Sequence, residues 1–361
     1  MGKILILANF DVGLYKFRKD LIQELLKENQ VYISLPDGSF VKPLQEMGCI
    51  FLDTPVDRRG INPKTDLKLL KRYRRMLREI RPDQVITYTI KPNIYGGIAC
   101  RLAKIPYAVN ITGLGTAFQK EGMLRKVITV MYRFACKKAK TVFFENEGNY
   151  HTLSFYQIVR KDQAVVLPGA GINLEEYPFT PYPSGNEGYH FLFIGRVMKE
   201  KGIDELFAAA KRIRSERQDV SFDIVGPYED DYRETVEQLV RENIISYHGF
   251  QEDVKPFIEA SHCFVLPSWH EGMANTLLEC ASMGRPLITS RIHGCMEAVQ
   301  ERKNGLLCTA QDAKSLYECI QEFLELTDPE KAEWGRFSRE WMEQVFDKKK
   351  VVEMTMAGLK L

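Results

Sequence analysis

The chain has 361 residues, of which 45% are hydrophobic, so it is long enough to build two domains with separate cores. Its formal net charge of +2 excludes no class of partner, but the charge is unevenly distributed. Residues 1–168 carry 28 Lys and Arg against 15 Asp and Glu, whereas the remainder carries 22 against 33. The two halves therefore carry opposite electrostatic fields, and this asymmetry is more informative than the net charge.

Cysteine usage and hydropathy predict a cytosolic protein that does not span a membrane. The eight cysteines include no C-x-x-C pair and lie mostly in apolar stretches, which favours reduced core residues over a zinc site or a disulfide framework. Met1–Ala8 is a short apolar run followed by polar residues, so it predicts a strand and not a signal peptide. No uncharged run approaches the length of a membrane span.

The first half alternates between apolar runs and helical patterns, which predicts βαβ units around a parallel sheet. The predicted strands are Lys3–Ala8, Val31–Leu35, Val85–Tyr88, Tyr107–Asn110 and Ala164–Leu167. Ligands of such sheets bind at the carboxyl ends of strands, here at the loop Asn9–Gly13. Arg18, in a predicted helix Leu14–Asn29, could reach a phosphate group of a ligand bound there or could simply lie on the surface.

Two helical patterns in the first half are rich in cations. The segment Pro63–Arg81 contains two carboxylates, Asp66 and Glu79, and eight cations: Lys64, Lys68, Lys71, Arg72, Arg74, Arg75, Arg78 and Arg81. It is either a solvated helix face or a patch for anionic lipid headgroups, where each charge contributes about 1 kcal/mol. Nucleic acid is disfavoured because no recognised nucleic-acid module accompanies the charge. Met123–Lys140 is either a core helix or a shallow membrane contact.

A new βα pattern begins after Tyr177–Gly188, a segment rich in Pro and Gly that predicts a linker. The strand Tyr189–Ile194 leads into a turn with Gly195, Arg196, Lys201 and Gly202. Two cations and two glycines at a strand-to-helix turn suit a diphosphate that approaches the backbone closely. Two further strands are predicted, Ser221–Val225 with a turn at Gly226-Pro227, and Ile245–Phe250, whose exit loop Gln251–Val254 should frame the base of a nucleotide.

Leu266–Ser290 predicts a strand, a loop, a helix and a second strand. The loop carries Glu271, and the helix carries Glu279 and stops at Gly284-Arg285-Pro286. The amino terminus of that helix offers backbone N–H groups and partial positive charge, which suit a phosphate.

These residues resemble those of a known family. Glu271 and Glu279 stand in the frame P-S-x-x-E-G-x-x-x-x-x-L-E-x-x-x-x-G-x-P, followed by Gly294, Glu297 and Asn304-Gly305. The frame is similar to the E-x7-E signature of family 4 retaining glycosyltransferases of the bacterial capsular, exopolysaccharide or O-antigen type. Gly195–Gly202 resembles the family's diphosphate clamp, and Gly169–Asn173 its crossing motif between domains. The resemblance implies the GT-B fold: two Rossmann-like, doubly wound α/β domains that face a cleft.

The resemblance also implies a division of labour. We expect residues 1–175 to form an acceptor domain on which a carboxyl-terminal helix, about 340–361, packs back, and 188–339 to form a donor domain. Arg196 and Lys201 would stabilise the leaving diphosphate, Glu271 would bind donor-sugar hydroxyls, and Glu279 would bind the ribose. The other expected binding residues are Gly13, Gly195, Gly226, Phe250, Gly272, Met273, Ala274, Asn275 and Thr276, with backbone N–H groups of Gly272 to Ala274 assisting Glu271.

The function implied is a glycosyltransferase that moves a sugar from a nucleotide-sugar, expected to be a UDP-sugar, to a polyprenyl-diphosphate-linked saccharide. It would work on the cytoplasmic face of the membrane and need no metal or cofactor besides its donor substrate. Many relatives have a His near the turn Asn110–Thr116, whereas the first His in this chain is His151. Any contribution of the amino-terminal domain to catalysis on the acceptor would therefore come from Asn110, Thr112 or backbone groups. Two alternatives stay open: a UDP-sugar 2-epimerase of the same architecture, and a catalytically silent sugar-nucleotide-binding subunit.

Overall fold

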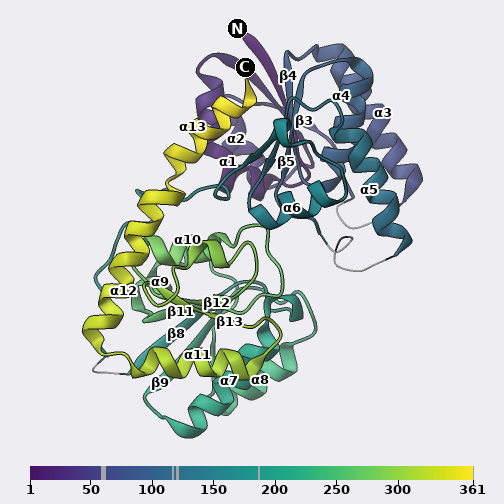
Figure 1. The fold of residues 1–361 in the computed structure, drawn as a ribbon. Helices are drawn as coiled ribbons and strands as arrows, with labels where there is room; N and C mark the ends of the chain where they lie inside the picture. The colour runs from purple at the N-terminus through teal and green to yellow at the C-terminus, as the bar shows by residue number, and fades with distance from the viewer. Residues whose placement is uncertain (58–61, 116–117, 119–121, 186–187, 361) are drawn as a thin grey trace. The chain divides into compact units, whose positions relative to one another are not determined.

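The computed structural model describes residues 1–57, 62–115, 118, 122–185 and 188–360, which form two compact units (Figure 1). Unit 1 comprises Met1–Gly171 and Lys348–Leu361, and unit 2 comprises Ile172–Asp347. Thr116 of the predicted Asn110–Thr116 turn and residues 186–187 of the predicted linker lie outside the described residues.

Unit 1 contains a parallel sheet that has seven strands within the described residues, in the order β3-β2-β1-β4-β5-β6-β7. The strands are β1 Gly2–Leu7, β2 Asn29–Leu35, β3 Ile50–Asp53, β4 Gln84–Tyr88, β5 Tyr107–Ile111, β6 Thr141–Phe144 and β7 Ala164–Val166. The helices are α1 Asp11–Leu26, α2 Val41–Glu46, α3 Pro63–Ile80, a π-helix Pro92–Gly96, α4 Gly97–Ala103, α5 Met123–Cys136, α6 Glu147–Phe155, a 3₁₀ turn Lys161–Gln163 and α13 Lys348–Leu359.

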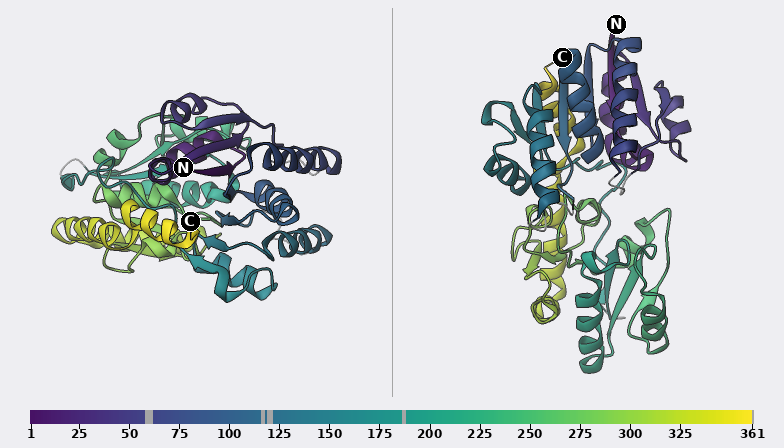
Figure 2. Two further views of the ribbon diagram at one scale, coloured as in Figure 1. Left: turned by 90° about the horizontal axis from the view of Figure 1, so that it is seen from above. Right: turned by 90° about the vertical axis from the view of Figure 1, so that its right-hand side faces the viewer.

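The alternating side chains of β1 explain why both faces of this sheet are covered (Figure 2). Ile4 and Ile6 point into a core shared with α1 and α13, whereas Leu5 and Leu7 point into a core shared with α3, α4 and α5. A strand that is buried on both faces reads as a continuous apolar run, as Lys3–Ala8 does.

Unit 2 repeats this plan with a parallel sheet of order β10-β9-β8-β11-β12-β13. The strands are β8 Tyr189–Ile194, β9 Val220–Val225, β10 Ser246–Tyr247, β11 Cys263–Leu266, β12 Leu287–Ser290 and β13 Gly305–Cys308. The helices are α7 Ile203–Glu216, α8 Arg233–Arg241, α9 Lys255–Ala260, α10 Asn275–Ser282, α11 Ala313–Glu325 and α12 Asp328–Trp341, with 3₁₀ turns Lys199–Lys201 and Met296–Ala298 and a π-helix Met342–Phe346.

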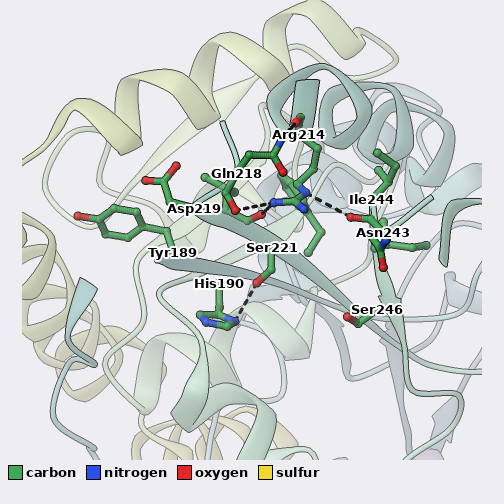
Figure 3. A pocket seen from close by; sticks show the side chains of 12 residues that line it. Tyr189, His190, Arg214, Gln218, Asp219, Ser221, Asn243, Ile244 and Ser246 are labelled. Carbon is green, nitrogen blue, oxygen red and sulfur yellow. Dashed lines mark hydrogen bonds between the residues drawn. The ribbon is translucent and has the colours of Figure 1, made fainter. Parts of the chain in front are cut away.

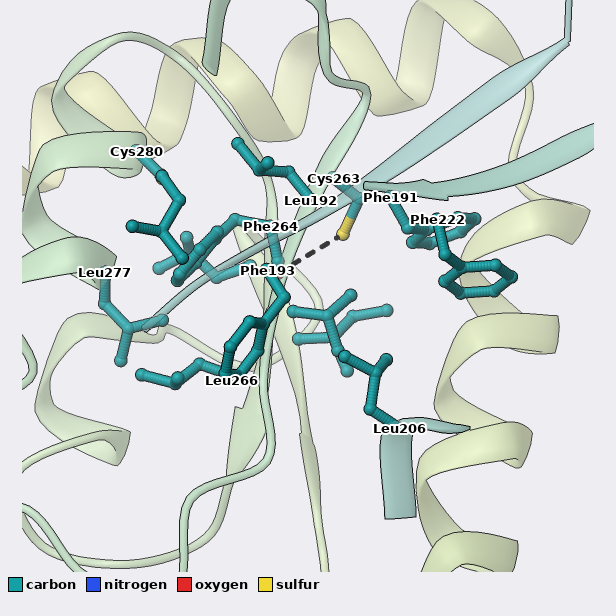
Figure 4. Close-up of a cluster of buried hydrophobic side chains, with 14 of the residues drawn as sticks. Phe191, Leu192, Phe193, Leu206, Phe222, Cys263, Phe264, Leu266, Leu277 and Cys280 are labelled. Atoms are coloured by element: carbon teal, nitrogen blue, oxygen red, sulfur yellow. Dashed lines mark hydrogen bonds between the residues drawn. The ribbon is translucent and has the colours of Figure 1, made fainter. Parts of the chain in front are cut away.

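The core of unit 2 lies on both faces of its sheet. Phe191, Phe193, Phe222 and Phe264 pack there with Leu277 of α10, and all are at most 1% exposed (Figure 4). The strand order corresponds to 3-2-1-4-5-6, the arrangement of doubly wound nucleotide-binding sheets, so the order reverses between β8 and β11. The predicted fold class, two doubly wound parallel sheets, is confirmed.

Several predicted boundaries differ from the structure because distant contacts decide them. Helix α1 begins at Asp11, so Gly13 lies in its first turn and not in a loop. β10 covers only Ser246–Tyr247 of the predicted strand Ile245–Phe250. The helix that joins unit 1 begins at Lys348, since Trp334, Met342 and Phe346, within the predicted return segment or just before it, pack in the core of unit 2.

The predicted linker is also held by unit 2. Thr180 donates from its backbone N–H to the Met283 carbonyl, at 3.3 Å, and the Tyr182 hydroxyl donates to the His262 carbonyl, at 3.0 Å. The two units instead separate between Gly171 and Ile172 and between Asp347 and Lys348. Among the helices that the structure describes, none is long and apolar enough to cross a membrane.

Candidate active site

The residues with the strongest chemical prediction meet at the switch point of the unit 2 sheet. Arg196 and Lys201 follow β8, and Glu271 follows β11, which is the neighbour of β8 on the other side of the reversal. In open α/β sheets this crevice, at the carboxyl ends of the strands, is where ligands bind.

Three glycines with positive φ let the loops of this edge pack against one another. A Cβ on Gly202 (φ +73°) would overlap the Pro267 carbonyl oxygen, and one on Gly226 (φ +144°) would overlap that of Gly195. A Cβ on Gly294 (φ +89°) would lie 2.7 Å from the carbonyl oxygens of Glu271 and Gly272. The loops after β8, β9, β11 and β12 thus form one packed rim because side chains are missing where their backbones touch.

Both predicted clamp cations contact carboxylates. The Lys201 ammonium donates to Glu271 Oε1, which also accepts from the Ser268 hydroxyl at 2.8 Å. Arg196 Nη1 lies 3.4 Å from Glu229 Oε1, on the turn after β9. Arg196 is 46% exposed, whereas the side chains of Lys201 and Glu271 are 20% and 12% exposed, so the second pair lies deeper in the rim.

Helix α10 begins beside Glu271, with Ala274 as its N-cap and Asn275 and Thr276 in its first turn. The Ala274 N–H donates to the Gly294 carbonyl at 2.8 Å, so this amide is committed within the rim. Its donation to a sugar hydroxyl, which the resemblance implies, stays a prediction. Glu279 lies one turn further along α10, where it bonds the hydroxyl of Tyr177, whose pKa is raised by burial and by this carboxylate.

The side chains flanking the two acids complete the rim. Trp269 donates its backbone N–H to the Glu200 carbonyl, at 3.0 Å, and the Lys199 ammonium lies 5.7 Å from the centroid of its ring. His270 Nε2 lies 3.6 Å from Glu200 Oε2. Phe250 is 68% exposed, just after Gly249, whose carbonyl accepts from the Gly226 N–H at 2.8 Å. An exposed ring on this rim is available to stack on a flat ligand.

Arg285 belongs to the same sequence frame but has a structural position. Its side chain is fully buried and donates to the carbonyls of Ile258, Glu259, Pro181 and Gly284 and to the Thr180 hydroxyl. Burial lowers the pKa of this guanidinium to about 10. Arg285 therefore attaches residues 180–181 to unit 2 and does not face a ligand.

In unit 1, the predicted residues at the carboxyl edge serve the fold. Arg18 pairs with Glu145 and lies over the ring of Tyr88, 5.1 Å from its centroid, and both charged side chains are 11% exposed. The Asn110 side chain donates to the Thr87 carbonyl at 3.2 Å. A Cβ on Gly13 would make only an ordinary contact with Phe10, so nothing at that position requires glycine.

Sequence reasoning missed two unusual features at the switch point of unit 1, after β4. Thr89 has φ +71°, which is rare for a β-branched residue, and the π-helix Pro92–Gly96 follows directly. Lys91, just before the π-helix, donates from its ammonium to one oxygen of Asp66 on α3 at 2.7 Å, and Tyr95, within the π-helix, donates from its hydroxyl to the other oxygen at 3.0 Å. No sequence pattern that we used reports a left-handed threonine or a π-helix.

A surface pocket of about 330 Å³ lies at the opposite edge of the unit 2 sheet, where β8, β9 and β10 begin (Figure 3). Arg214 lies at its centre and donates to the carbonyls of Asn243, Gln218 and Val220 at 3.2, 2.7 and 2.8 Å. This cation is engaged by the backbone, so the rim around Glu271 is the stronger candidate. Among the described residues, no group of three or more His, Cys, Asp or Glu is placed to hold a metal ion.

Comparisons with known proteins agree with this division of the chain. Residues 188–326 match a family model described as "Glycosyl transferases group 1", and residues 3–146 match one described as "Glycosyl transferase 4-like". The chain is 25% identical to the N,N'-diacetylbacillosaminyl-diphospho-undecaprenol alpha-1,3-N-acetylgalactosaminyltransferase of Campylobacter jejuni, over 90% of this chain and 89% of that one. It is 28% identical to an Escherichia coli UDP-Gal:alpha-D-GlcNAc-diphosphoundecaprenol alpha-1,3-galactosyltransferase, over 84% and 82%.

Solved structures are similar over the whole length. The Anabaena protein HepE, solved in complex with UDP and glucose, has a TM-score of 0.82 at 18% identity and covers 100% of both chains. A glycosyltransferase from Rickettsia africae has a TM-score of 0.81 at 18% identity and covers 99% of this chain and 98% of its own. At this level of identity the similarity establishes the fold alone.

Proposed function

The chain belongs to the family 4 retaining glycosyltransferases of the GT-B fold, and from this membership we propose that it transfers a sugar from a UDP-sugar to a lipid-linked saccharide during surface polysaccharide synthesis. The observation that carries the proposal is the meeting of Arg196, Lys201 and Glu271 at one switch point. Two relatives named above act on saccharides bound to diphospho-undecaprenol, which supports an acceptor of that class.

The chemistry divides between the charged residues of the rim. Arg196 and Lys201 neutralise the charge that develops on the diphosphate as it leaves, and the first turn of α10 adds backbone N–H groups. Glu271 accepts hydrogen bonds from donor-sugar hydroxyls, and Glu279, oriented by Tyr177, accepts them from the ribose. Phe250 stacks on the base, and Trp269, His270, Met273 and Asn275 influence which sugar fits.

The reaction proceeds on one face of the sugar. The anomeric carbon loses its bond to the diphosphate and gains a bond to the acceptor oxygen, while the acceptor proton passes to a donor phosphate oxygen. The anomeric configuration is retained without a protein nucleophile. UDP is the second product, with its added charge held by the two cations.

The charge of unit 1 suits an acceptor held at an anionic membrane surface. Residues of unit 1 include 32 Lys and Arg against 16 Asp and Glu. Six cations on α3 are exposed: Lys64, Lys68, Lys71, Arg74, Arg75 and Arg78. Each contributes about 1 kcal/mol near anionic lipid and less at high salt.

Helix α5 presents apolar side chains to solvent as well. Four of them are between 42% and 75% exposed: Met123, Val127, Val130 and Phe134. Their spacing of four, three and four residues places them on one side of the helix. Lys126, Arg133, Lys137 and Lys138 are also exposed on this helix or just beyond it. Because α4 packs against both α3 and α5, the two helices belong to one side of unit 1. An apolar stripe flanked by cations is typical of a helix that lies in the lipid headgroup region on the cytoplasmic face.

The test of the transferase is a turnover assay with undecaprenyl-diphospho-N-acetylglucosamine and a panel of UDP-sugars, accompanied by calorimetric titration with UDP. We expect transfer from one donor and UDP binding. Arg196→Ala should abolish transfer and weaken UDP binding, whereas Arg336→Ala, which removes an exposed cation from α12, should leave both unchanged. Interconversion of a UDP-sugar without acceptor would instead indicate an epimerase. UDP binding without either reaction would indicate a catalytically silent subunit.

Membrane binding is tested separately by cosedimentation with vesicles of phosphatidylglycerol and phosphatidylcholine. Val127→Ser combined with Val130→Ser should reduce binding, as should 0.5 M salt, whereas Val240→Ser on α8 of unit 2, 40% exposed, should not. Equal binding by all variants would refute the α5 surface and leave the transferase proposal intact.

A further inference from the structure

The acidic turn after β9, Gly226–Tyr232, is packed directly against the turn that carries Arg196 and Lys201. The Val197 N–H donates to the Pro227 carbonyl at 2.9 Å, and the Glu229 N–H donates to the Val197 carbonyl at 3.2 Å. The Lys199 N–H donates to Asp230 Oδ2 at 3.0 Å. The backbone thus holds Glu229 beside Arg196, with the two charged groups 3.4 Å apart.

A diphosphate bound by Arg196 has to share this guanidinium with the Glu229 carboxylate. If the diphosphate displaces the carboxylate, the ion pair is lost. If both anions stay on the guanidinium, they repel each other across a few ångströms. In either case the negative charge at position 229 weakens the binding of the diphosphate.

A diphosphate would compete with a carboxylate for Lys201 as well, the less exposed of the two cations. Lys201 donates to Glu271, so a diphosphate that attracts the ammonium competes with the carboxylate proposed to hold the donor sugar. Glu271 has a second partner in Ser268, at 2.8 Å, which keeps the carboxylate in place when Lys201 shifts toward phosphate. Glu229 differs because it lies outside the E-x7-E frame and has no part in the proposed sugar contacts.

We infer that Glu229 is a positioning residue that competes with the diphosphate for Arg196, and that it accelerates the release of UDP after transfer. The donor substrate is held by its sugar as well as by its diphosphate, whereas UDP has lost the sugar contacts. A competing carboxylate therefore costs UDP a larger share of its binding free energy than it costs the donor. The inference rests on the proposed function, because the competing anion is taken to be the diphosphate of the donor and product.

The experiment measures UDP binding to the unmodified protein and four variants by calorimetry, with dissociation rates from stopped-flow fluorescence. The variants are Glu229→Gln, Arg196→Ala, the double variant of the two, and Glu237→Gln, which removes an exposed carboxylate from α8 as a control for net charge. Because exposed ion pairs are weak, we expect Glu229→Gln to tighten UDP binding by about twofold to fivefold. The change should appear in the dissociation rate, and UDP should become a stronger product inhibitor.

The double variant distinguishes competition for Arg196 from a general effect of charge. In the Arg196→Ala background, Glu229→Gln should leave the residual affinity for UDP unchanged within about 1.5-fold. The inference is overturned if Glu229→Gln matches Glu237→Gln, if its effect persists without Arg196, or if it weakens UDP binding, which would make Glu229 an orienting group for the guanidinium. Absence of UDP binding by the unmodified protein would instead contradict the proposed function.

Discussion

Acidification should destabilise unit 2 through His262, a histidine that is only 2% exposed. Its Nδ1 accepts from the His190 N–H at 3.1 Å, and its Nε2 lies 3.2 Å from the Ser184 carbonyl oxygen. A neutral ring satisfies both contacts, whereas a protonated ring presents a donor to the His190 N–H. Burial, with His190 and Arg285 nearby, lowers the pKa of His262 from 6.5 to about 4, against a smaller opposing effect of the Ser184 carbonyl and Asp328.

The sign of the effect follows from proton uptake. Between pH 6.5 and 4 the unfolded chain binds a proton at His262 that the folded chain does not, so the free energy of unfolding falls as the pH falls through this window. The full contribution is present above pH 6.5, and about 2–3 kcal/mol of it is lost at pH 4.5, because each unit of pKa difference corresponds to about 1.4 kcal/mol.

The perturbation that isolates this contribution is His262→Asn, whose amide oxygen can replace Nδ1 as acceptor but which does not titrate. Urea unfolding followed by tryptophan fluorescence reports unit 2 specifically, because all three tryptophans, Trp269, Trp334 and Trp341, lie in that unit. The variant should be less stable than the unmodified protein at pH 7.5, and the difference in unfolding free energy should shrink by about 2–3 kcal/mol at pH 4.5. His151→Asn, in unit 1, controls for the loss of an exposed histidine.

The reasoning is refuted if the two unfolding free energies differ by the same amount at pH 7.5 and pH 4.5. That outcome would mean that His262 carries an ordinary pKa in the folded protein, and that its surroundings accommodate the charged ring.

Two further predictions concern backbone packing and buried charge. Gly226→Ala should lower the affinity for UDP more than tenfold, measured by calorimetry. The reason is that a Cβ at Gly226 overlaps the Gly195 carbonyl and forces the turn before Arg196 to move. Gly122→Ala is the control, because a Cβ there meets nothing within 4 Å and should not change the affinity. Arg18→Met should destabilise unit 1 by about 3–5 kcal/mol, measured by hydrogen exchange of its strands, because the buried Glu145 carboxylate loses its ion-pair partner. The double variant Arg18→Met with Glu145→Met should recover stability if this is the cause. An equal loss of stability in the single and double variants would contradict it.

The parts of the fold that sequence could predict are those determined by neighbouring residues. Helix α10 ends just before Gly284, which has φ +81°, as the Gly-Arg-Pro sequence indicates. The seven-residue spacing places Glu271 in the loop and Glu279 one turn inside the helix. Apolar runs predicted parallel strands that are buried on both faces, and their alternation with helical patterns predicted the doubly wound class.

The parts that sequence could not predict depend on distant partners. Helix α1 starts at Asp11, three residues before the predicted start, and the Asp11 carboxylate accepts from the Phe40 N–H at 2.8 Å. Arg18 looked available to an acceptor because its partner, Glu145, is 127 residues away. The contact between Glu229 and Arg196 could not be predicted for the same reason, because it depends on how the turns after β8 and β9 pack together.

The acidity of unit 2 explains why its anion site depends on local contacts. The unit carries 32 Asp and Glu against 18 Lys and Arg, so its overall field repels a diphosphate. Binding therefore has to come from groups within a few ångströms, namely Arg196, Lys201 and the first turn of α10, because Coulomb interactions are strongest at short distance. We therefore expect a carboxylate in contact with one of these groups, as Glu229 is with Arg196, to have a measurable effect on diphosphate binding, and one more acid elsewhere on the acidic surface to have almost none.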